Sequence, residues 1–473
     1  METGFNVRSI RRLTADKNHN AFTGAAWFRG ELYVAFRQGD AHVCPQGRLV
    51  VLRSRDDGVS FDSVAVIRGV YDTRDAHLYT NGDRLFVAGF EATPDGPRAG
   101  AAWSDDGLHW SAWTPYSGTE GYVMWRPCCH KNRFFCAGYR FRKDQADSQV
   151  AWFESSDGTC WEEKRTIHAG ADLPNECAFD FMDDGTVVML MRRGIVSKKP
   201  LLLRALPPYE TWDNVELDVP LHGPALWLVG EEIWISGRWF LPSGVTHLGV
   251  FSVENDKPKL QLVLPSGPDR DQSYMGVARH PLNKRRFALS YYSGHTAGDD
   301  PNVSQWSHPD IYLADIVFAS EFIHEWQVSD LIEDAHLGAE TFDQASKWGS
   351  VTANNESGSG YGFVNASERI AKRPGVIIFR TQIEAGPTDA ALLHLGYDGA
   401  IIARVNGKVV HEGAATNPAL PDLATVPITF NHGANVLEIA LGTQGGQACG
   451  IFARWEAAQP RKNDEATLLE ERA

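Results

Sequence analysis

The segment AGAAWSDDGLHW, residues 99–110, carries a pattern that occurs three times in this chain. A short apolar run leads to a Ser, an Asp-Gly pair and an aromatic residue. The same order is present in RLVVLRSRDDGVSF, residues 48–61, and in SQVAWFESSDGTCW, residues 148–161. From one copy to the next, the Asp-Gly pairs are 49 and 51 residues apart. This spacing indicates a repeated structural unit of about 50 residues.

Each copy has the residues of a tight turn that follows a strand. Gly permits a positive φ, and a nearby Asp carboxylate can accept hydrogen bonds from backbone N–H groups. The aromatic residue, which is Phe61, Trp110 or Trp161, is expected to pack between strands. The motif therefore predicts a fold and says little about chemistry.

The inner part of each unit also repeats at intervals of about 50 residues. Six segments contain an apolar strand, a turn and a second apolar strand, and they begin at Ala25, His77, Val123, Cys177, Pro224 and Tyr274. Long helical patterns are scarce, which favours a strand-rich fold. Six units of four short antiparallel strands predict a six-bladed β-propeller. The N-terminal run FNVRSIRRL, residues 5–13, is expected to close the ring beside DIYLADIVF, residues 310–318.

The character of the sequence changes near Gly338. Strand-like runs continue, and the Asn406-Gly407 pair between two of them predicts a type I′ hairpin. The fold class is therefore all-β, with a six-bladed β-propeller followed by a jelly-roll-like β-sandwich. We expect the propeller over residues 1–325, a linker over 326–340, the sandwich over 341–460 and a charged tail over 461–473.

Composition narrows the possible functions. The 473 residues are 43% hydrophobic and 22% charged, as in ordinary globular proteins. A formal net charge of −15 argues against a nucleic-acid partner. There is no run of about 18 apolar residues, so no membrane span is expected. No signal peptide is visible, and the localisation is left open between cytoplasmic, for the sequence as given, and secreted, if a leader has been removed. The oligomeric state is left open.

The chain has seven cysteines at irregular spacing. The Cys128-Cys129-His130 triplet has no second Cys/His pair at the spacing of a zinc site. We therefore expect free thiols in a reducing compartment, no bound metal and no cofactor.

Candidate ligand-binding residues follow from the register of the inner segments. The second strand of each pair is expected to end at Arg37, Phe90, Tyr139, Arg192, Arg238 and Tyr292. Inner strands of a propeller line a central channel, so the three arginines are expected to converge at one mouth. Guanidinium groups that converge repel one another unless an anion lies between them, and a carboxylate fits their geometry. The register therefore predicts an acidic ligand.

The repeated turn resembles the Asp-box of sialidases, S-x-D-x-G-x-x-W, with Phe61 at the place of the Trp in the first copy. A second likeness is more specific. In NECAFDFMDDGTVVMLMR, residues 175–192, a Glu, an Asp-Gly turn and an Arg follow one another at a spacing similar to that in sialidases. This resemblance to the sialidase superfamily implies that Glu176 activates the nucleophile. It also implies that Arg192 is one of three arginines that bind the substrate carboxylate.

The resemblance further implies that Arg238 is the third arginine and that Tyr274 is the nucleophile. This chemistry is coherent, because a tyrosine with an ordinary pKa of about 10 needs an adjacent base such as Glu176. A neutral nucleophile also avoids repulsion by the carboxylate of the substrate. Sialidases are exceptions among glycosidases in using a tyrosine nucleophile.

Two positions depart from the family pattern. Sialidases have a first arginine in a Y/F-R-I-P motif, but residues 22–24 read Phe-Thr-Gly here, and Arg37 is the candidate replacement. The loop expected to hold the general acid, QGDAHVCPQG, offers Asp40 and His42. Asp72 and Asp75, in DTRDAHL, are further candidates, and the same stretch contains Arg74 and His77. We therefore expect a relative with an altered substrate or an altered reaction.

Three more residues near strand ends complete the candidate ligand-binding set. They are Arg126, Tyr292 and Trp239, and Trp239 is a candidate sugar platform. Simpler interpretations stand beside these roles. Glu176 could be a strand carboxylate that only pairs with an arginine, and Tyr274 could simply line the channel.

Two C-terminal segments resemble the galactose-binding-like sandwiches that are appended to many glycoside hydrolases. They are YDGAIIARVNGKVV, residues 397–410, and HGANVLEIAL, residues 432–441. Whether this domain binds sugar or only packs on the propeller stays open.

Three functions fit these observations, and each has an acidic oligosaccharide or glycoconjugate as its partner. The first is an exo-acting glycoside hydrolase on a terminal sialic-acid-like or uronate sugar, with Asp40, His42 or Asp75 as the general acid. The second is a polysaccharide lyase that acts on uronate glycans by β-elimination through a His and a Tyr. The third is a carbohydrate-binding propeller without catalysis.

Overall fold

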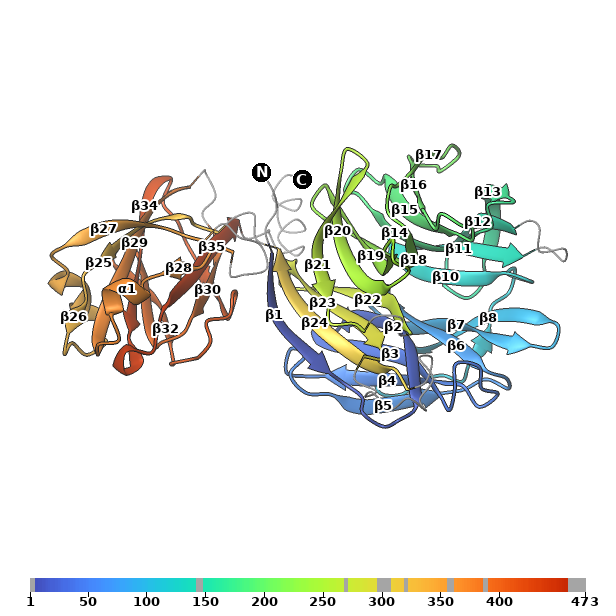
Figure 1. Cartoon of the computed structure of the whole chain (residues 1–473), viewed down its shortest axis with the longest axis horizontal. Helices are drawn as coiled ribbons and strands as arrows, with labels where there is room; N and C mark the ends of the chain where they lie inside the picture. The colour runs from blue at the N-terminus through green and yellow to red at the C-terminus, as the bar shows by residue number, and fades with distance from the viewer. Residues whose placement is uncertain are drawn as a thin grey trace, which may run out of the picture. The chain divides into compact units, whose positions relative to one another are not determined.

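The computed structural model describes residues 5–141, 148–267, 271–295, 308–318, 322–354, 361–385 and 390–457. Within these ranges almost all regular structure is β-strand (Figure 1). Contacts divide the chain into two compact units, one formed by Ser9–Ile316 and the other by Val317–Ala473 with Met1–Arg8. None of the helices in the described ranges is long and apolar enough to cross a membrane.

Five consecutive four-stranded sheets make the first five blades. Blade one contains β2 (His19–Phe28), β3 (Glu31–Gly39), β4 (Arg48–Ser54) and β5 (Asp62–Ile67). Blade two contains β6 (Thr73–Thr80), β7 (Leu85–Thr93), β8 (Gly96–Ser104) and β9 (Thr114–Pro115). Blade three contains β10 (Val123–His130), β11 (Arg133–Phe141), β12 (Ser148–Ser155) and β13 (Glu162–Gly170). Blade four contains β14 (Pro174–Phe181), β15 (Val187–Arg193), β16 (Leu201–Ala205) and β17 (Asp213–Glu216). Blade five contains β18 (Leu221–Val229), β19 (Glu232–Phe240), β20 (Thr246–Glu254) and β21 (Lys257–Leu264).

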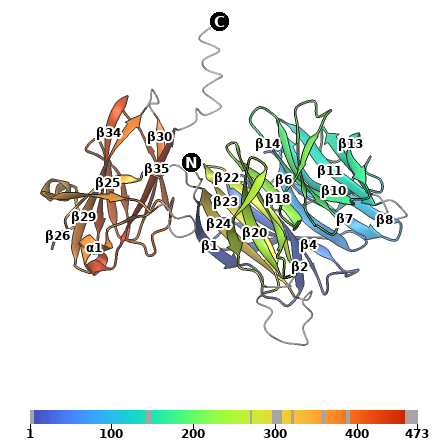
Figure 2. The same ribbon diagram turned by 45° about the horizontal axis from the view of Figure 1, so that its top comes forward.

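Blade six combines strands from the two ends of the repeat. It contains β22 (Gln272–His280), β23 (Asn283–Ser293), β24 (Asp310–Phe318) and β1 (Phe5–Arg12). Figures 1 and 2 show the dark blue β1 beside the yellow β24. All residues of β24 are buried, as expected of a strand with a neighbour on each edge. The predicted six-bladed propeller and its closure by the N-terminal strand are therefore confirmed.

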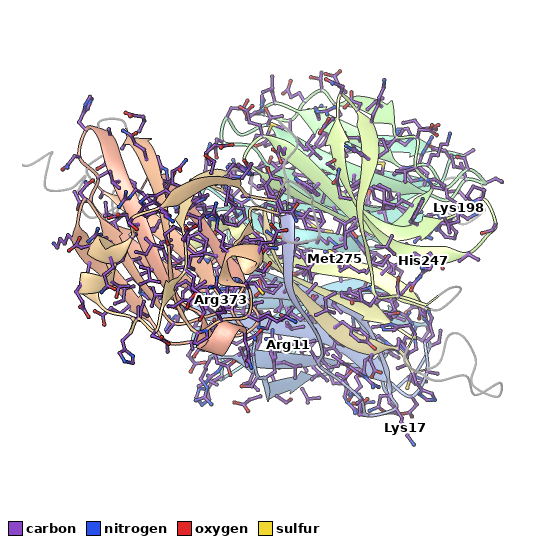
Figure 3. All side chains as sticks on the ribbon, turned by 60° about the vertical axis from the view of Figure 1, so that its left-hand side comes forward. Arg11, Lys17, Lys198, His247, Met275 and Arg373 are labelled. Carbon is purple, nitrogen blue, oxygen red and sulfur yellow. The ribbon has the colours of Figure 1, made fainter. Side chains whose placement is uncertain are left out.

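The exposure of side chains differs between the interior of the propeller and its edge. Met275 of β22 is fully buried and lies inside the propeller in Figure 3. Lys17, in the exposed turn before β2, lies at the edge.

The three repeated turns hold their backbone with an Asp side chain. In the second and third copies, the carboxylates of Asp106 and Asp157 each accept two backbone N–H groups at 2.7–2.8 Å. In the first copy Asp56 accepts a backbone N–H at 2.8 Å, whereas Asp57 pairs with Arg286. The glycines of the three turns have φ between 78° and 86°.

The C-terminal unit contains two sheets. The larger has the order β27 (Trp348–Thr352), β25 (Glu325–Ser329), β29 (Gly375–Ala385), β34 (Gly433–Gly442), β31 (Ile401–Val405) and β32 (Lys408–Gly413), with β26 (Ile332–Glu333) also on β29. The smaller has the order β28 (Val364–Asn365), β35 (Gly450–Ala457), β30 (Ala391–Tyr397) and β33 (Ala424–Ile428). Short helices are η1 (Ala339–Gln344), α1 (Ser367–Ile370) and η2 (Gln444–Gly446). One buried apolar cluster takes side chains from both sheets, which makes the unit a β-sandwich.

Local details of this unit refine the sequence-based expectations. Asn406 and Gly407 have φ of 49° and 80°, as a type I′ turn requires. Residues 326–329 and 332–333, which the predicted linker includes, belong to β25 and β26, and both strands pair with neighbours in the larger sheet. Trp326 and Val328 are buried there, so this part of the predicted linker belongs to the sandwich. The predicted tail, 461–473, lies outside the described residues.

Candidate active site

The innermost strand of each blade contains a β-bulge at the same place. The first strands of neighbouring blades contact one another around the ring, which identifies them as innermost. Their pairing shifts register at bulges whose first residues are Phe22, Asp75, Arg126, Asn175, Gly223 and Tyr274. All of these except Asn175 have φ between 48° and 60°. Such a φ is strained for a residue other than glycine, and strain of this kind concentrates at functional sites.

A pocket of about 250 Å³ lies among these bulges. It is lined by Phe22, His42, Arg74, Asp75, Phe90, Trp125, Tyr139, Glu176, Arg238, Asp271, Tyr274 and Tyr292. Every blade contributes at least one of these residues, so the complete ring is needed to form the pocket. Among the predicted site residues, the pocket brings together Tyr274, Glu176, His42, Asp75, Arg238 and Tyr292.

A tyrosine, a glutamate and an arginine form the centre of the site. The hydroxyl of Tyr274 donates a hydrogen bond to Glu176 Oε1 at 2.8 Å. Arg192 donates to the same carboxylate oxygen, and its Nη1 lies 3.4 Å from the Tyr274 hydroxyl. Burial and the negative charge of Glu176 raise the pKa of Tyr274 above its ordinary value. The tyrosine is therefore neutral at rest, with a proton acceptor already in place.

Asp75 supplies a second carboxyl group to the pocket. Its side chain is buried, and Oδ2 has no hydrogen-bond partner among the described residues. Burial raises the pKa of Asp75 to about 7. A carboxyl group with this pKa can hold a proton near neutral pH and release it to a leaving group.

Arg126 is not among the residues that line the pocket, but it interacts with residues that do. Its Nη1 donates to the backbone carbonyl of Met275 at 2.6 Å. Burial lowers the pKa of Arg126 to about 10, and the charges of Glu176 and Asp75 act in the opposite direction. Arg126 therefore contributes positive charge close to both carboxyl groups.

Asp271 organises the side of the pocket that blades one, five and six form. Its Oδ1 accepts hydrogen bonds from Tyr292 at 2.9 Å and from Arg238 at 3.2 Å. Its Oδ2 lies 3.1 Å from His19 Nε2 and 3.3 Å from His42 Nδ1. Burial raises the pKa of this carboxyl, but these hydrogen bonds outweigh it and hold the pKa below the ordinary range. Neither Asp271 nor His19 was among the sequence candidates, because no motif marks either residue.

Five predicted site residues are absent from the pocket lining, namely Arg126 and Arg192, described above, and Arg37, Asp40 and Trp239. Arg37 is fully buried and donates through Nε and Nη2 to Asp72. This bidentate pair occupies the guanidinium that was expected to contact a ligand. Asp40 is exposed directly after β3, and Trp239 packs edge-on against Phe251 with ring centroids 5.7 Å apart.

Arg74 is the arginine that reaches the pocket from blade two. Its guanidinium lies over the ring of Phe22 at 5.4 Å, where the sequence departs from the family's first arginine motif. Arg74 also donates to the carbonyl of His42 at 3.0 Å and to Asp72 at 3.1 Å. Sequence reasoning named this residue only as a neighbour of Asp75.

No protein-family model and no curated protein matches the chain. A solved protein of unknown function from Dyadobacter fermentans DSM 18053 is 16% identical, with a TM-score of 0.56 over 67% of this chain and 99% of that chain. The likeness concerns the fold alone.

Two solved enzymes are more distant. An α-L-arabinanase from Penicillium chrysogenum is 14% identical, with a TM-score of 0.46 over 67% of this chain and 99% of that chain. A sialidase from Trypanosoma rangeli is 10% identical, with a TM-score of 0.46 over 98% of this chain and 96% of that chain.

Proposed function

We propose that the protein is an exo-acting glycoside hydrolase that releases a terminal acidic sugar, such as a sialic-acid-like or uronate residue. The observation that carries the proposal is the hydrogen bond from Tyr274 to Glu176 in a pocket that also contains Asp75. These three groups are a nucleophile, its base and a proton donor.

The chemistry uses each group once in the first step. Glu176 takes the phenolic proton as the Tyr274 oxygen forms a bond to the anomeric carbon. The glycosidic bond breaks, and its electron pair goes to the leaving oxygen, which takes the proton of Asp75. Water then attacks the anomeric carbon, Asp75 takes a proton from that water, and the released phenolate recovers its proton from Glu176.

The balance of charge supports an acidic ligand. The pocket and the groups that touch it contain five guanidinium groups, those of Arg37, Arg74, Arg126, Arg192 and Arg238. The negative groups near them are the carboxylates of Asp72, Glu176 and Asp271. Asp75, with a pKa of about 7, is only partly ionised at neutral pH. The excess is positive in a chain of formal net charge −15, so a carboxylate on the ligand would be attracted locally. We leave Arg37 out of the ligand contacts because Asp72 occupies its guanidinium.

The test is a panel of sialosides and uronate-ended oligosaccharides, with reducing sugar and ultraviolet absorbance both recorded. New reducing ends without absorbance are expected. Replacing Tyr274 by Phe should lower turnover by at least about 10³-fold, because the nucleophile is lost. Tyr79→Phe is the matched control, since this buried tyrosine bonds Tyr116 away from the pocket and should leave turnover unchanged. Full activity in Tyr274→Phe would refute the assignment.

A polysaccharide lyase is the second candidate, and the position of His42 favours it. His42 lines the same pocket as Tyr274 and Tyr292, so a base and a phenol face one volume. The same panel separates the two reactions, because an unsaturated uronate absorbs in the ultraviolet and a hydrolysis product does not. Saturable binding with neither signal would instead support a carbohydrate-binding propeller.

A further inference from the structure

Two histidines and a carboxylate converge at the edge of the pocket, and the proposed hydrolysis uses none of them. Both His19 Nε2 and His42 Nδ1 face the same oxygen of Asp271, at 3.1 Å and 3.3 Å. The three ligating atoms all lie within 4.8 Å of one another. Three protein ligands are the usual number in a metal centre that keeps one position open.

The three residues come from different elements of the ring. His19 begins β2, His42 lies in the loop after β3, and Asp271 immediately precedes β22. The side chains of His19 and Asp271 are 0% and 1% exposed, whereas that of His42 is 40% exposed. Two ligands are therefore fixed in the interior, and the third lies on the side from which an ion can enter.

Other groups orient Asp271 for this role. Its second oxygen, Oδ1, is held by Tyr292 at 2.9 Å and by Arg238 at 3.2 Å. These contacts leave Oδ2 directed at the two imidazoles. Hydrogen bonds of this kind to the outer oxygen of a ligating carboxylate are typical of metal sites, because they fix its orientation.

We propose that His19, His42 and Asp271 bind a divalent transition-metal ion of the zinc class. Two imidazole nitrogens and one carboxylate oxygen suit Zn²⁺, whose bonds to such ligands are about 2.0–2.2 Å long, whereas Mg²⁺ and Ca²⁺ prefer oxygen ligands alone. The open position faces the pocket, because both His42 and Asp271 line it. This proposal departs from the sequence-based expectation of no metal.

The open position gives the ion a role in recognition. In the hydrolase proposed above, it takes a carboxylate or hydroxyl oxygen of the sugar. This role rests on the proposed function, whereas metal binding itself does not.

The experiment is calorimetric titration of the full chain with ZnCl₂ after chelator treatment and dialysis. We expect one ion per chain in the unaltered protein and at least tenfold weaker binding in His42→Ala. The His42 side chain is 40% exposed and lies in a loop, so its removal should leave the fold intact. Zn²⁺ should also raise the melting temperature of the unaltered protein more than that of the variant, because an ion bound to the folded state stabilises it. His109→Ala is the matched control, since this imidazole is 90% exposed and pairs with Asp106 on a repeated turn.

Two results would overturn the assignment. They are the absence of saturable binding in the unaltered chain and an unchanged affinity in His42→Ala. Glycosidase assays on the same samples keep the two proposals separate. Stoichiometric Zn²⁺ binding without hydrolysis leaves the metal site standing and removes the hydrolase, and hydrolysis without Zn²⁺ binding does the reverse.

Discussion

At the scale of single residues, Asp75 combines burial with a raised pKa, and the stability of the fold should reflect this. Its pKa is about 7 in the folded protein, against 3.8 for an ordinary Asp. The unfolded chain therefore loses this proton first as pH rises, and stability falls between about pH 4 and pH 7. Over this window the group costs about 4 kcal/mol of unfolding free energy, as an order of magnitude.

The variant Asp75→Asn tests this cost. It removes the titration, so the variant should be more stable than the unaltered protein above pH 7 and should lose that advantage as pH falls towards 4. Denaturant unfolding at several pH values measures the difference. A stability difference that stays constant with pH would show that Asp75 does not titrate in this window.

The same residue predicts the pH dependence of turnover. The general acid must be protonated, so kcat should fall as pH rises through about 7. Asp75→Asn should lower kcat by about 10²–10⁴-fold and abolish this alkaline limb, because the amide carries no transferable proton. A pH–rate profile of both proteins is the measurement. An unaltered alkaline limb in the variant would assign the limb to another group.

Single residues of the site could be predicted only where a local pattern reports on them. Glu176 and Tyr274 were found by their likeness to a family motif, and their direct hydrogen bond agrees with that pairing. His19 and Asp271 are 252 positions apart in the sequence, and no local motif near either residue indicates that they are in contact. The pair between Arg37 and Asp72, 35 positions away, could not be inferred from strand register.

At the scale of elements, the β-bulge in each innermost strand explains why strand register predicted the positions of the three arginines only in part. Arg37 and Arg238 do pair with the residue before the bulge of their blades. In blade four the residue at this position is Arg193, and Arg192 lies opposite the bulge. A bulge adds one residue to one strand, and composition does not reveal where it falls.

The repeated turns make a prediction at this scale. A Cβ at Gly107 would lie 2.0 Å from the hydroxyl of buried Tyr33, whereas a Cβ at Gly82 would meet nothing within 4 Å. Both glycines have positive φ, of 78° and 94°, so alanine is strained at either place. Gly82→Ala should cost about 1 kcal/mol and Gly107→Ala about 2 kcal/mol more, because only the second also forces a clash. Denaturant titration compares them, and equal losses would contradict the close contact.

At the scale of the whole molecule, the propeller could be predicted because repetition is visible in sequence. Six similar segments fix the number of blades, and the apolar runs at residues 5–13 and 310–318 identified the closing pair. The limit between propeller and sandwich was harder to predict, because β25 is as strand-like as its neighbours and no break in composition precedes it.

Removing the closing strand should destabilise the ring. Deletion of residues 1–12 takes away β1, exposes the edge of β24 and removes buried Phe5, which packs against Phe318. The loss of the phenyl ring alone is expected to cost about 3–5 kcal/mol. Arg12→Ala is the matched control, because its ion pair with Asp310 is partly exposed and should be worth less than about 1 kcal/mol. Equal melting temperatures for the deletion and the control would contradict a closing role for β1.

Closure of the propeller by the N-terminal strand also determines when, during protein synthesis, the ring can be completed. Arg12 and its partner Asp310 are 298 residues apart, and the ribosome adds about 5–20 residues per second. Roughly 15–60 s therefore pass between the synthesis of β1 and the synthesis of β24, the strand with which it pairs. Since every blade contributes to the pocket, a nascent chain arrested before the sixth blade lacks the complete pocket. Prematurely terminated translation products should accordingly be inactive, and their free strand edges make them substrates for chaperones and proteases.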